Sequence, residues 1–395
     1  MSLFTPYFNE THEQVRLTAR QFIQREVLPH INAWEEAGSF PREIYRKAGA
    51  AGLLGIGHDP AYGGTGEDVF MKIAATEEVM RSTSGGFAAS LGSLDIALPP
   101  LEKWGSQALK DRFVGPVLAG DMIAALAITE PSGGSDVASL RTRAERRHDE
   151  VNGDHYVVNG SKIYITNSPV ADVLLVYAKT DKDRGAKGIS AFIVEKDFPG
   201  FKVAQKLNKM GFRGSQTGEL VFEDCKVPVE NLVGVENAGV KVVMSGLDLE
   251  RAMISPICLG IAERAFALTL DYAKQRKQFG RSISEFQMVQ SKLADMYTWV
   301  ESMRLFTYQT LRAANVIGED DGGRGEIHKL TAAGVLYVAE TMNKVLNDAV
   351  QVHGGTGYIW ESEINRLYRS IKLLEIGAGT SEVRKMIIAK ELLTA

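Results

Sequence analysis

The spacing of apolar residues divides the chain into three parts. From about Thr11 to Gly120 the apolar positions recur with a helical period, as in Val15, Ala19, Phe22, Ile23 and Val27. Turn residues interrupt this part at 60–66 and at Pro99-Pro100, and we interpret both places as loops. The pattern predicts a helical first domain over residues 1–120.

Between about Asp121 and Gly234 the apolar residues form short runs that are rich in β-branched and aromatic side chains. The runs lie at 155–158, 172–177, 189–194 and 219–222, and turn residues separate them. We therefore predict a central β-barrel or β-sandwich domain over residues 121–235.

From about Val240 the helical period returns over long stretches, which are broken at Gly280, at 318–325 and at 354–357. Three or four long antiparallel helices account for this pattern, so residues 236–395 are predicted to form a C-terminal four-helix-bundle domain. The predicted fold class is therefore α+β and multidomain, with helical, β and helical domains in that order.

Composition limits the classes of function. The 395 residues are 45% hydrophobic and 24% charged, which is typical of a globular chain with two or three domains. A net charge of −4 argues against nucleic-acid binding, which needs a basic face. No run approaches the roughly 18 apolar residues of a membrane span, so we expect no membrane insertion.

The cysteines and histidines show no pattern of a metal site. Cys225 and Cys258 lack metal-ligand spacing and form no disulfide framework, which indicates a reducing compartment, and the seven histidines are scattered. We predict no metal. The first residues carry no signal for export or organelle import, so the expected location is the cytoplasm.

One carboxylate, Glu250, lies on an apolar helical stripe. Helical spacing puts it on the face that also carries Leu247, Met253, Ile254 and Ile257. Burial raises the pKa of a carboxyl group toward neutrality, as a general base that takes a proton from carbon near pH 7 requires. The alternative is a glutamate at the core edge that pairs with an arginine, because structural ion pairs also perturb pKa values.

A loop that could hold a ligand follows the first β run, in Leu126-Ala-Ile-Thr-Glu-Pro-Ser-Gly-Gly-Ser-Asp136. Its two glycines allow close approach of a ligand to the backbone, and Thr129 and Ser135 add hydroxyl donors for an anionic or carbonyl-rich ligand. A plain turn between strands is the alternative, and these residues alone leave both interpretations open.

The same segment resembles the flavin signature of the acyl-CoA dehydrogenase family. The resemblance implies cofactor contacts at Leu126, Ile128 and Gly134, with Thr129 at the isoalloxazine edge and Ser135 reaching the pyrophosphate and the substrate. A second flavin segment, Tyr164-Ile-Thr-Asn167, implies that Thr166 bonds the N5 region and that Tyr164 packs on the ring, where many members have tryptophan. The implied cofactor is FAD.

The resemblance covers the chain nearly end to end. In the C-terminal part, Arg276, Phe279 and Gln287 lie in stretches that resemble those reaching the FAD of a neighbouring subunit, and Gln351, Gly354 and Gly355 lie in a segment similar to a second signature. This implies a composite cofactor site and a homotetramer. Ser370 stands where an aspartate is usual. The stretches 209–217 and 222–228 resemble the end of the family's β domain, and structural turns are the alternative for them.

The motif at 375–382 separates groups within the family. In most members the residue two before its threonine is the catalytic glutamate, but this chain has Ala378 there. The isovaleryl-CoA and long-chain members place the base on the helix that carries Glu250 here, and the isovaleryl-CoA members are the most similar. The resemblance further implies cofactor contacts at Thr380, Ser381 and Glu382. It implies substrate contacts at Ser135, Asp248, Arg251, Gly377, Ala378 and Gly379, although Asp248 and Arg251 could instead pair with each other.

The implied reaction is the α,β-dehydrogenation of an acyl-CoA thioester to a trans-2-enoyl-CoA, with electrons passed to electron-transferring flavoprotein. Gly377 replaces a bulky tyrosine of many relatives, and Phe87 stands near the position where glutaryl-CoA enzymes carry an arginine, so a branched or bulky monoacyl substrate is expected. The alternatives are a dehydrogenase for medium, long or terpenoid branched acyl-CoAs and an oxidase on the same fold. A nucleic-acid-binding relative would need a basic C-terminal extension, and a desulfinase would not be expected to keep the base.

Overall fold

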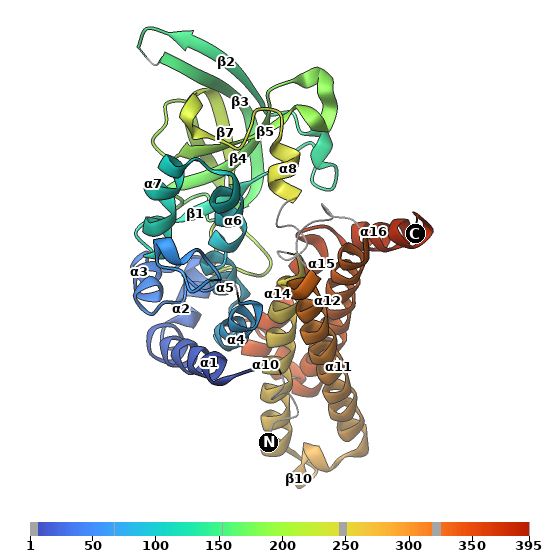
Figure 1. The fold of residues 1–395 in the computed structure, drawn as a ribbon. Helices are drawn as coiled ribbons and strands as arrows, with labels where there is room; N and C mark the ends of the chain where they lie inside the picture. Colours follow the sequence, from blue (N-terminus) through green and yellow to red (C-terminus); the bar gives the residue numbers. More distant parts are fainter. Residues whose placement is uncertain (1–6, 67, 152, 245–250, 318–324, 395) are drawn as a thin grey trace.

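The computed structural model describes residues 7–66, 68–151, 153–244, 251–317 and 325–394. Figure 1 shows the first helices (blue) on one side of the sheet (green), with a bundle of long helices (gold to orange) reaching away from the sheet. The predicted order of helical, β and helical parts is confirmed.

The N-terminal part is helical, and polar side chains start four of its helices. Asn9, Asp68, Ser84 and Ser106 accept backbone N–H groups at the starts of α1, α4, α5 and α7, as N-cap residues do. The helices are α1 (Glu10–Phe22, continued by a π-helical turn, Ile23–Val27), α2 (Ile31–Ala37), α3 (Glu43–Ala50), α4 (Val69–Met80), α5 (Gly85–Leu91), α6 (Leu94–Trp104) and α7 (Gln107–Leu118), with a 3₁₀ turn at Pro60–Tyr62.

The prediction of a loop at Pro99-Pro100 is wrong, because both prolines lie inside α6. Proline removes a backbone donor from a helix interior, but its fixed φ is itself helical. Leu98 and Leu101 flank the pair and are 2% and 1% exposed, so burial of this face outweighs the lost hydrogen bonds.

The central part is one mixed sheet within the described residues, and the predicted β domain is confirmed. Its strand order is β6-β7-β3-β2-β4-β5-β8, and β1 pairs in parallel with β4. The strands are β1 (Ala124–Ala127), β2 (Arg143–Asp149), β3 (Gly153–Thr166), β4 (Val173–Lys179), β5 (Ile189–Glu195), β6 (Phe201–Lys206), β7 (Thr217–Pro228) and β8 (Leu232–Val233), with 3₁₀ segments at Val137–Ser139, Lys182–Gly188 and Val229–Asn231.

Strand β4 is buried on both faces, which explains its continuous apolar sequence. Its odd-numbered residues, such as Leu175 and Tyr177, join the core of the N-terminal helices. Its even-numbered residues, such as Leu174 and Val176, join the core inside the sheet domain. The first two parts of the chain therefore share a core across one face of the sheet.

Among its described residues, the C-terminal part is built on three long helices, and glycines with positive φ mark two predicted breaks, Gly280 (φ 77°) and Gly354 (φ 58°). The predicted break at 318–325 falls mainly outside the described residues. The elements are α8 (Gly239–Met244), α10 (Ile254–Gln275), β9 (Lys277–Gln278), β10 (Arg281–Ser282), a 3₁₀ turn (Ile283–Glu285), α11 (Gln287–Ile317), α12 (Gly325–His353), α13 (Gly355–Tyr358), α14 (Glu363–Ser370), α15 (Leu373–Ile376) and α16 (Ser381–Thr394).

The loop between β6 and β7 joins all three parts. Phe212 has a positive φ and is buried in the core of the bundle, and its N–H lies 3.4 Å from Ser370 Oγ. A Cβ on Gly86 of the first domain would lie 2.6 Å from Phe212 O, so only glycine fits there. The part of the 209–217 stretch around Phe212 is therefore a structural turn, and Ser370 Oγ accepts a hydrogen bond from it.

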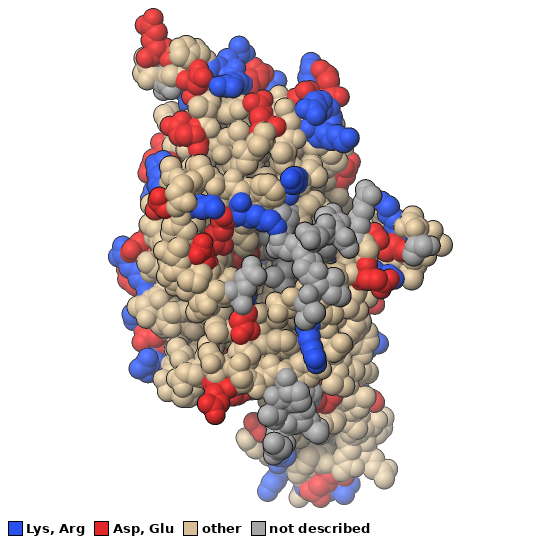
Figure 2. Space-filling view, in the orientation of Figure 1, with Lys and Arg blue, Asp and Glu red and all other residues tan. Residues whose placement is uncertain are grey.

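Neither the charge on the visible face nor the helices contradict the expectations from composition. On the face in Figure 2, Lys and Arg are interspersed with Asp and Glu. Among the described helices, none is both long enough and apolar enough to cross a membrane.

Candidate active site

The structure brings the two predicted flavin segments together. Strand β1 leads to Thr129, whose carbonyl oxygen accepts the N–H of Ile163 in β3 at 2.9 Å. Between Lys162 and Ile165, strand β3 has one residue more than β7 opposite it, which makes a β-bulge. At this bulge Tyr164 has φ of 62° and is 67% exposed, and Thr166 follows two residues later.

The loop after Thr129 is exposed at its tip and closed at its base. Gly134 and Ser135 lie at the exposed tip. Glu130 and Gly133 exchange backbone hydrogen bonds of 3.2 and 3.0 Å, which makes the turn that leads to them. The open tip suits contact with a ligand.

The 377–379 turn lies between α15 and α16. Ala378 and Gly379 have φ of 51° and 91°, so the chain reverses through the left-handed region, which is uncommon for alanine. The side chain of Arg384, 0% exposed, donates to Leu374 O at 3.0 Å and to Gly377 O at 2.9 Å. Arg384 thus holds the turn through two backbone carbonyls. Among the described residues, the Ala378 N–H has no hydrogen-bond acceptor.

Arg251, predicted to contact the substrate, lies near this turn. It is 5% exposed, and its Nη1 lies 3.4 Å from His328 Nδ1. Burial lowers the pKa of Arg384, and the charge of Arg251 adds to this shift, so the two guanidinium groups are neighbours. The predicted base Glu250 and its neighbour Asp248 lie outside the described residues.

The remaining predicted cofactor residues divide between two places. Thr380 Oγ1 accepts the N–H of Val383 at 3.2 Å at the start of α16. Ser381 is buried, and within the described part of the chain its Oγ has no hydrogen-bond partner. Glu382 is exposed, and hydrogen bonds from its own backbone N–H and from the Thr380 side chain lower its pKa.

The second group lies at the far end of the bundle, near β10 in Figure 1. Phe279 there is 93% exposed, and the ring of Tyr272 stacks on His353 at 4.3 Å, which brings Gly354 beside the end of α10. The 22-residue helix α10 spans about 33 Å, so these residues lie far from the 377–379 turn of the same chain. The group consists of Arg276, Phe279, Gln287, Gln351, Gly354 and Gly355.

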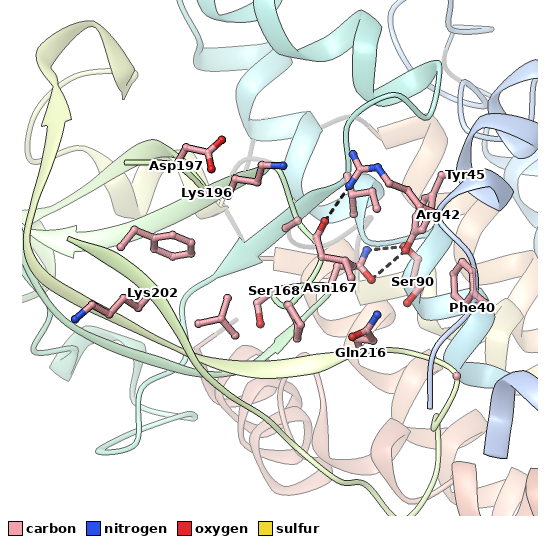
Figure 3. A pocket seen from close by; sticks show the side chains of 17 residues that line it. Phe40, Arg42, Tyr45, Ser90, Asn167, Ser168, Lys196, Asp197, Lys202 and Gln216 are labelled. Atoms are coloured by element: carbon pink, nitrogen blue, oxygen red, sulfur yellow. Dashed lines mark hydrogen bonds between the residues drawn. The ribbon is translucent and has the colours of Figure 1, made fainter. Parts of the chain in front are cut away.

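A cavity of about 400 Å³ opens between the first domain and the sheet, and Asn167, the residue after Thr166, lines it (Figure 3). Its buried polar groups bond one another. Asn167 Nδ2 donates to Ser90 O at 2.8 Å, and Tyr45 Oη donates to Asn167 Oδ1 at 3.2 Å. Leu126, Ile128 and the other predicted flavin residues are not among those that line it, so the cavity is a separate space beside the β3 bulge.

Several other side chains have structural positions. Phe87 is 0% exposed and packs on Trp34 and Phe40, so it belongs to the first domain's core. Burial raises the pKa of both thiols, Cys225 and Cys258, to about 12, which keeps them protonated. Over the described ranges, no three His, Cys, Asp or Glu residues lie close enough to hold a metal ion.

Sequence analysis missed three polar side chains that support the site: Glu130, Lys162 and Arg384. Lys162 had a detectable signal, because strand alternation puts it on the same face as the buried Tyr156 and Val158. Arg384 had none, since an arginine in a helix is usually exposed.

Comparisons with known proteins agree with this architecture. Residues 9–121, 125–225 and 237–393 match the N-terminal, middle and C-terminal domains of acyl-CoA dehydrogenases. The mitochondrial isovaleryl-CoA dehydrogenase of Oryza sativa subsp. japonica is 43% identical over 98% of this chain and 92% of its own. A short-chain-specific acyl-CoA dehydrogenase of Clostridium acetobutylicum is 40% identical over 98% and 99%. A probable acyl-CoA dehydrogenase of Mycobacterium abscessus superposes with a TM-score of 0.92, at 37% identity over 98% of this chain and 100% of that one.

Proposed function

The chain belongs to the acyl-CoA dehydrogenase family of FAD-dependent oxidoreductases, and we propose that it oxidises a short or branched acyl-CoA of the isovaleryl-CoA kind to the trans-2-enoyl-CoA. The observation that carries the proposal is the 377–379 turn. A small residue, Ala378, occupies the position of the usual base in the family, and Arg384 holds the turn by two backbone carbonyls.

The described residues fit FAD. Tyr164 and Phe279 present exposed aromatic rings, and a Cβ added to Gly354 or Gly355 would meet nothing within 4 Å. The buried Ser381 Oγ offers an unused hydrogen bond at the start of α16. When bound, FAD supplies the acceptor for the hydride that leaves the β carbon of the substrate.

The chain's own residues would then divide the remaining work. Glu250 takes the α proton on its carboxylate, and the electron pair of that C–H bond forms the new double bond as hydride leaves the β carbon. The Ala378 N–H donates to the thioester oxygen, where negative charge develops. Ser135 and Arg251 are proposed to bind the CoA part.

The substrate prediction follows from Gly377, which adds no side chain where many relatives have a bulky tyrosine. Phe87, near the position of the arginine in glutaryl-CoA enzymes, is an uncharged core residue and supplies no cation for a second carboxylate. Isovaleryl-CoA is therefore expected to reduce the flavin faster than glutaryl-CoA. An anaerobic titration with a panel of acyl-CoAs, followed by flavin bleaching, measures this. Faster reduction by glutaryl-CoA would contradict the proposed substrate class, and butyryl-CoA serves as the unbranched control.

The proposed homotetramer rests on the separation of the two groups of cofactor residues. Arg276 and Phe279 lie about one α10 length from the turn at Ala378, so a second copy would bring them to the first copy's FAD. We expect a tetramer in light scattering, and Arg276→Ala is expected to weaken FAD binding. Arg112→Ala, an exposed arginine paired with Glu195, is the control. A fully active monomer would refute the composite site.

Electron-transferring flavoprotein is the proposed acceptor, and the cytoplasm is the proposed location. The buried, unpaired thiols of Cys225 and Cys258 fit a reducing compartment. Oxygen consumption during turnover tests the acceptor, because an oxidase on this fold would reduce dioxygen stoichiometrically with product.

A further inference from the structure

A buried ion pair lies between the two proposed flavin segments. Lys162 Nζ is 2.8 Å from Glu130 Oε1, and the two side chains are 0% and 4% exposed. By contrast, both side chains of the Lys202–Glu223 pair in the same sheet are 64% exposed. Loss of one partner from a buried pair leaves an uncompensated buried charge. Removal of Lys162 or Glu130 is therefore expected to destabilise the structure around the pair.

The hydrogen bonds of this pair reach the segments that border the proposed site. Lys162 Nζ also donates to Ile128 O at 2.9 Å, one residue before Thr129. Glu130 Oε1 accepts the N–H of Thr142 at 2.9 Å, and its Oε2 accepts the N–H of Arg141 at 2.5 Å. The carboxylate thereby closes the base of the loop that carries Gly134 and Ser135.

The pair also lies at the start of the bulge. Lys162 is the last residue of β3 in register with β7 before the extra residue, and the next N–H, that of Ile163, donates to Thr129 O. The spacing between Thr129 and Thr166 therefore depends on where Lys162 holds the end of β1.

Each member of the pair shifts the pKa of the other toward its charged form. Burial lowers the pKa of Lys162 to about 8, although the charge of Glu130 opposes this shift. Burial by itself would raise the pKa of Glu130, but Lys162 and the N–H donors shift it below its usual range. Burial of two charged groups costs desolvation free energy, and the hydrogen bonds of the pair to both segments are consistent with a positioning role.

We propose that Glu130 and Lys162 are positioning residues that hold Thr129, Ser135 and Thr166 in the arrangement that FAD binding requires. The inference rests on the proposed flavin contacts of these three residues. It adds two side chains that touch neither flavin nor substrate but fix the segments that do.

The test uses Lys162→Met, which keeps the length of the side chain, and Glu130→Gln, which keeps its shape. Lys202→Met, in the exposed pair of the same sheet, is the matched control. Each flavin-free protein is titrated with FAD, and the dissociation constant, the absorption bands of the bound flavin and the thermal midpoint are measured. We expect at least about 30-fold weaker FAD binding and shifted flavin bands for both site variants, with the control unchanged.

Two outcomes would overturn the inference. One is FAD affinity and bands close to wild type in the folded variants, with only the thermal midpoint lowered. The other is failure of both variants to fold while Lys202→Met folds normally, since the pair would then serve the whole domain. Thr166→Ala in the same assay separates the proposed flavin contacts from the proposed positioning role of Glu130 and Lys162. If Thr166→Ala leaves FAD binding and the bands unchanged, the proposed flavin contacts fail, whatever Lys162→Met does.

Discussion

Glu250→Gln is expected to bind FAD and acyl-CoA normally but to reduce the flavin several orders of magnitude more slowly. The amide cannot accept the α proton, and a group that acts only in the transition state lowers the rate without lowering affinity. Stopped-flow reduction with isovaleryl-CoA, together with equilibrium binding of the product, measures the two effects separately. Glu326→Gln, an exposed glutamate paired with Lys329, is the matched control.

A second substitution tests whether the reaction needs only a carboxylate that reaches the α proton, whichever segment of the chain carries it. Ala378 occupies the position of the usual base in the family, so Ala378→Glu added to Glu250→Gln is expected to restore part of the rate. If Glu250→Gln alone reduces flavin at nearly the wild-type rate, the base lies elsewhere and the proposed active site is wrong.

Arg384→Met is expected to lower both stability and turnover. Methionine fills similar space but leaves Leu374 O and Gly377 O without their donor, and each lost buried hydrogen bond costs about 1–3 kcal/mol. The 377–379 turn then loses its support, and a shift of about 1 Å at the Ala378 N–H would lower kcat roughly 100-fold. Thermal unfolding and steady-state kinetics measure these effects.

The control for this prediction is the next residue of the same helix. Lys385 is exposed and pairs with Glu340 at 2.9 Å, so Lys385→Met is expected to change neither quantity appreciably. An Arg384→Met protein with normal kcat and a lowered midpoint would show that the arginine stabilises the fold without positioning the turn.

Periodicity alone established the order of the three parts. The shift from helical to alternating apolar spacing and back predicts which faces are buried, and this spacing is a local property of the sequence. Local sequence signals gave the wrong prediction at Pro99-Pro100, where a loop was expected and the structure has a helix. There the burial of Leu98 and Leu101 against distant residues, which local spacing does not reveal, keeps the prolines inside a helix.

The proposed site also has features that the sequence determined and features that only the tertiary structure decided. The sequence by itself determined which segments carry Thr129, Ser135, Thr166 and Ala378, because glycines and hydroxyl residues mark them locally and the family resemblance assigns their roles. Only the tertiary structure decided what holds these loops: Lys162 with Glu130, 32 residues apart, and Arg384 below the 377–379 turn. It also decided that Arg276 and Phe279 lie a helix length away. Contacts between residues distant in sequence depend on how the whole chain packs, so a polar side chain in a strand or helix does not reveal its buried partner.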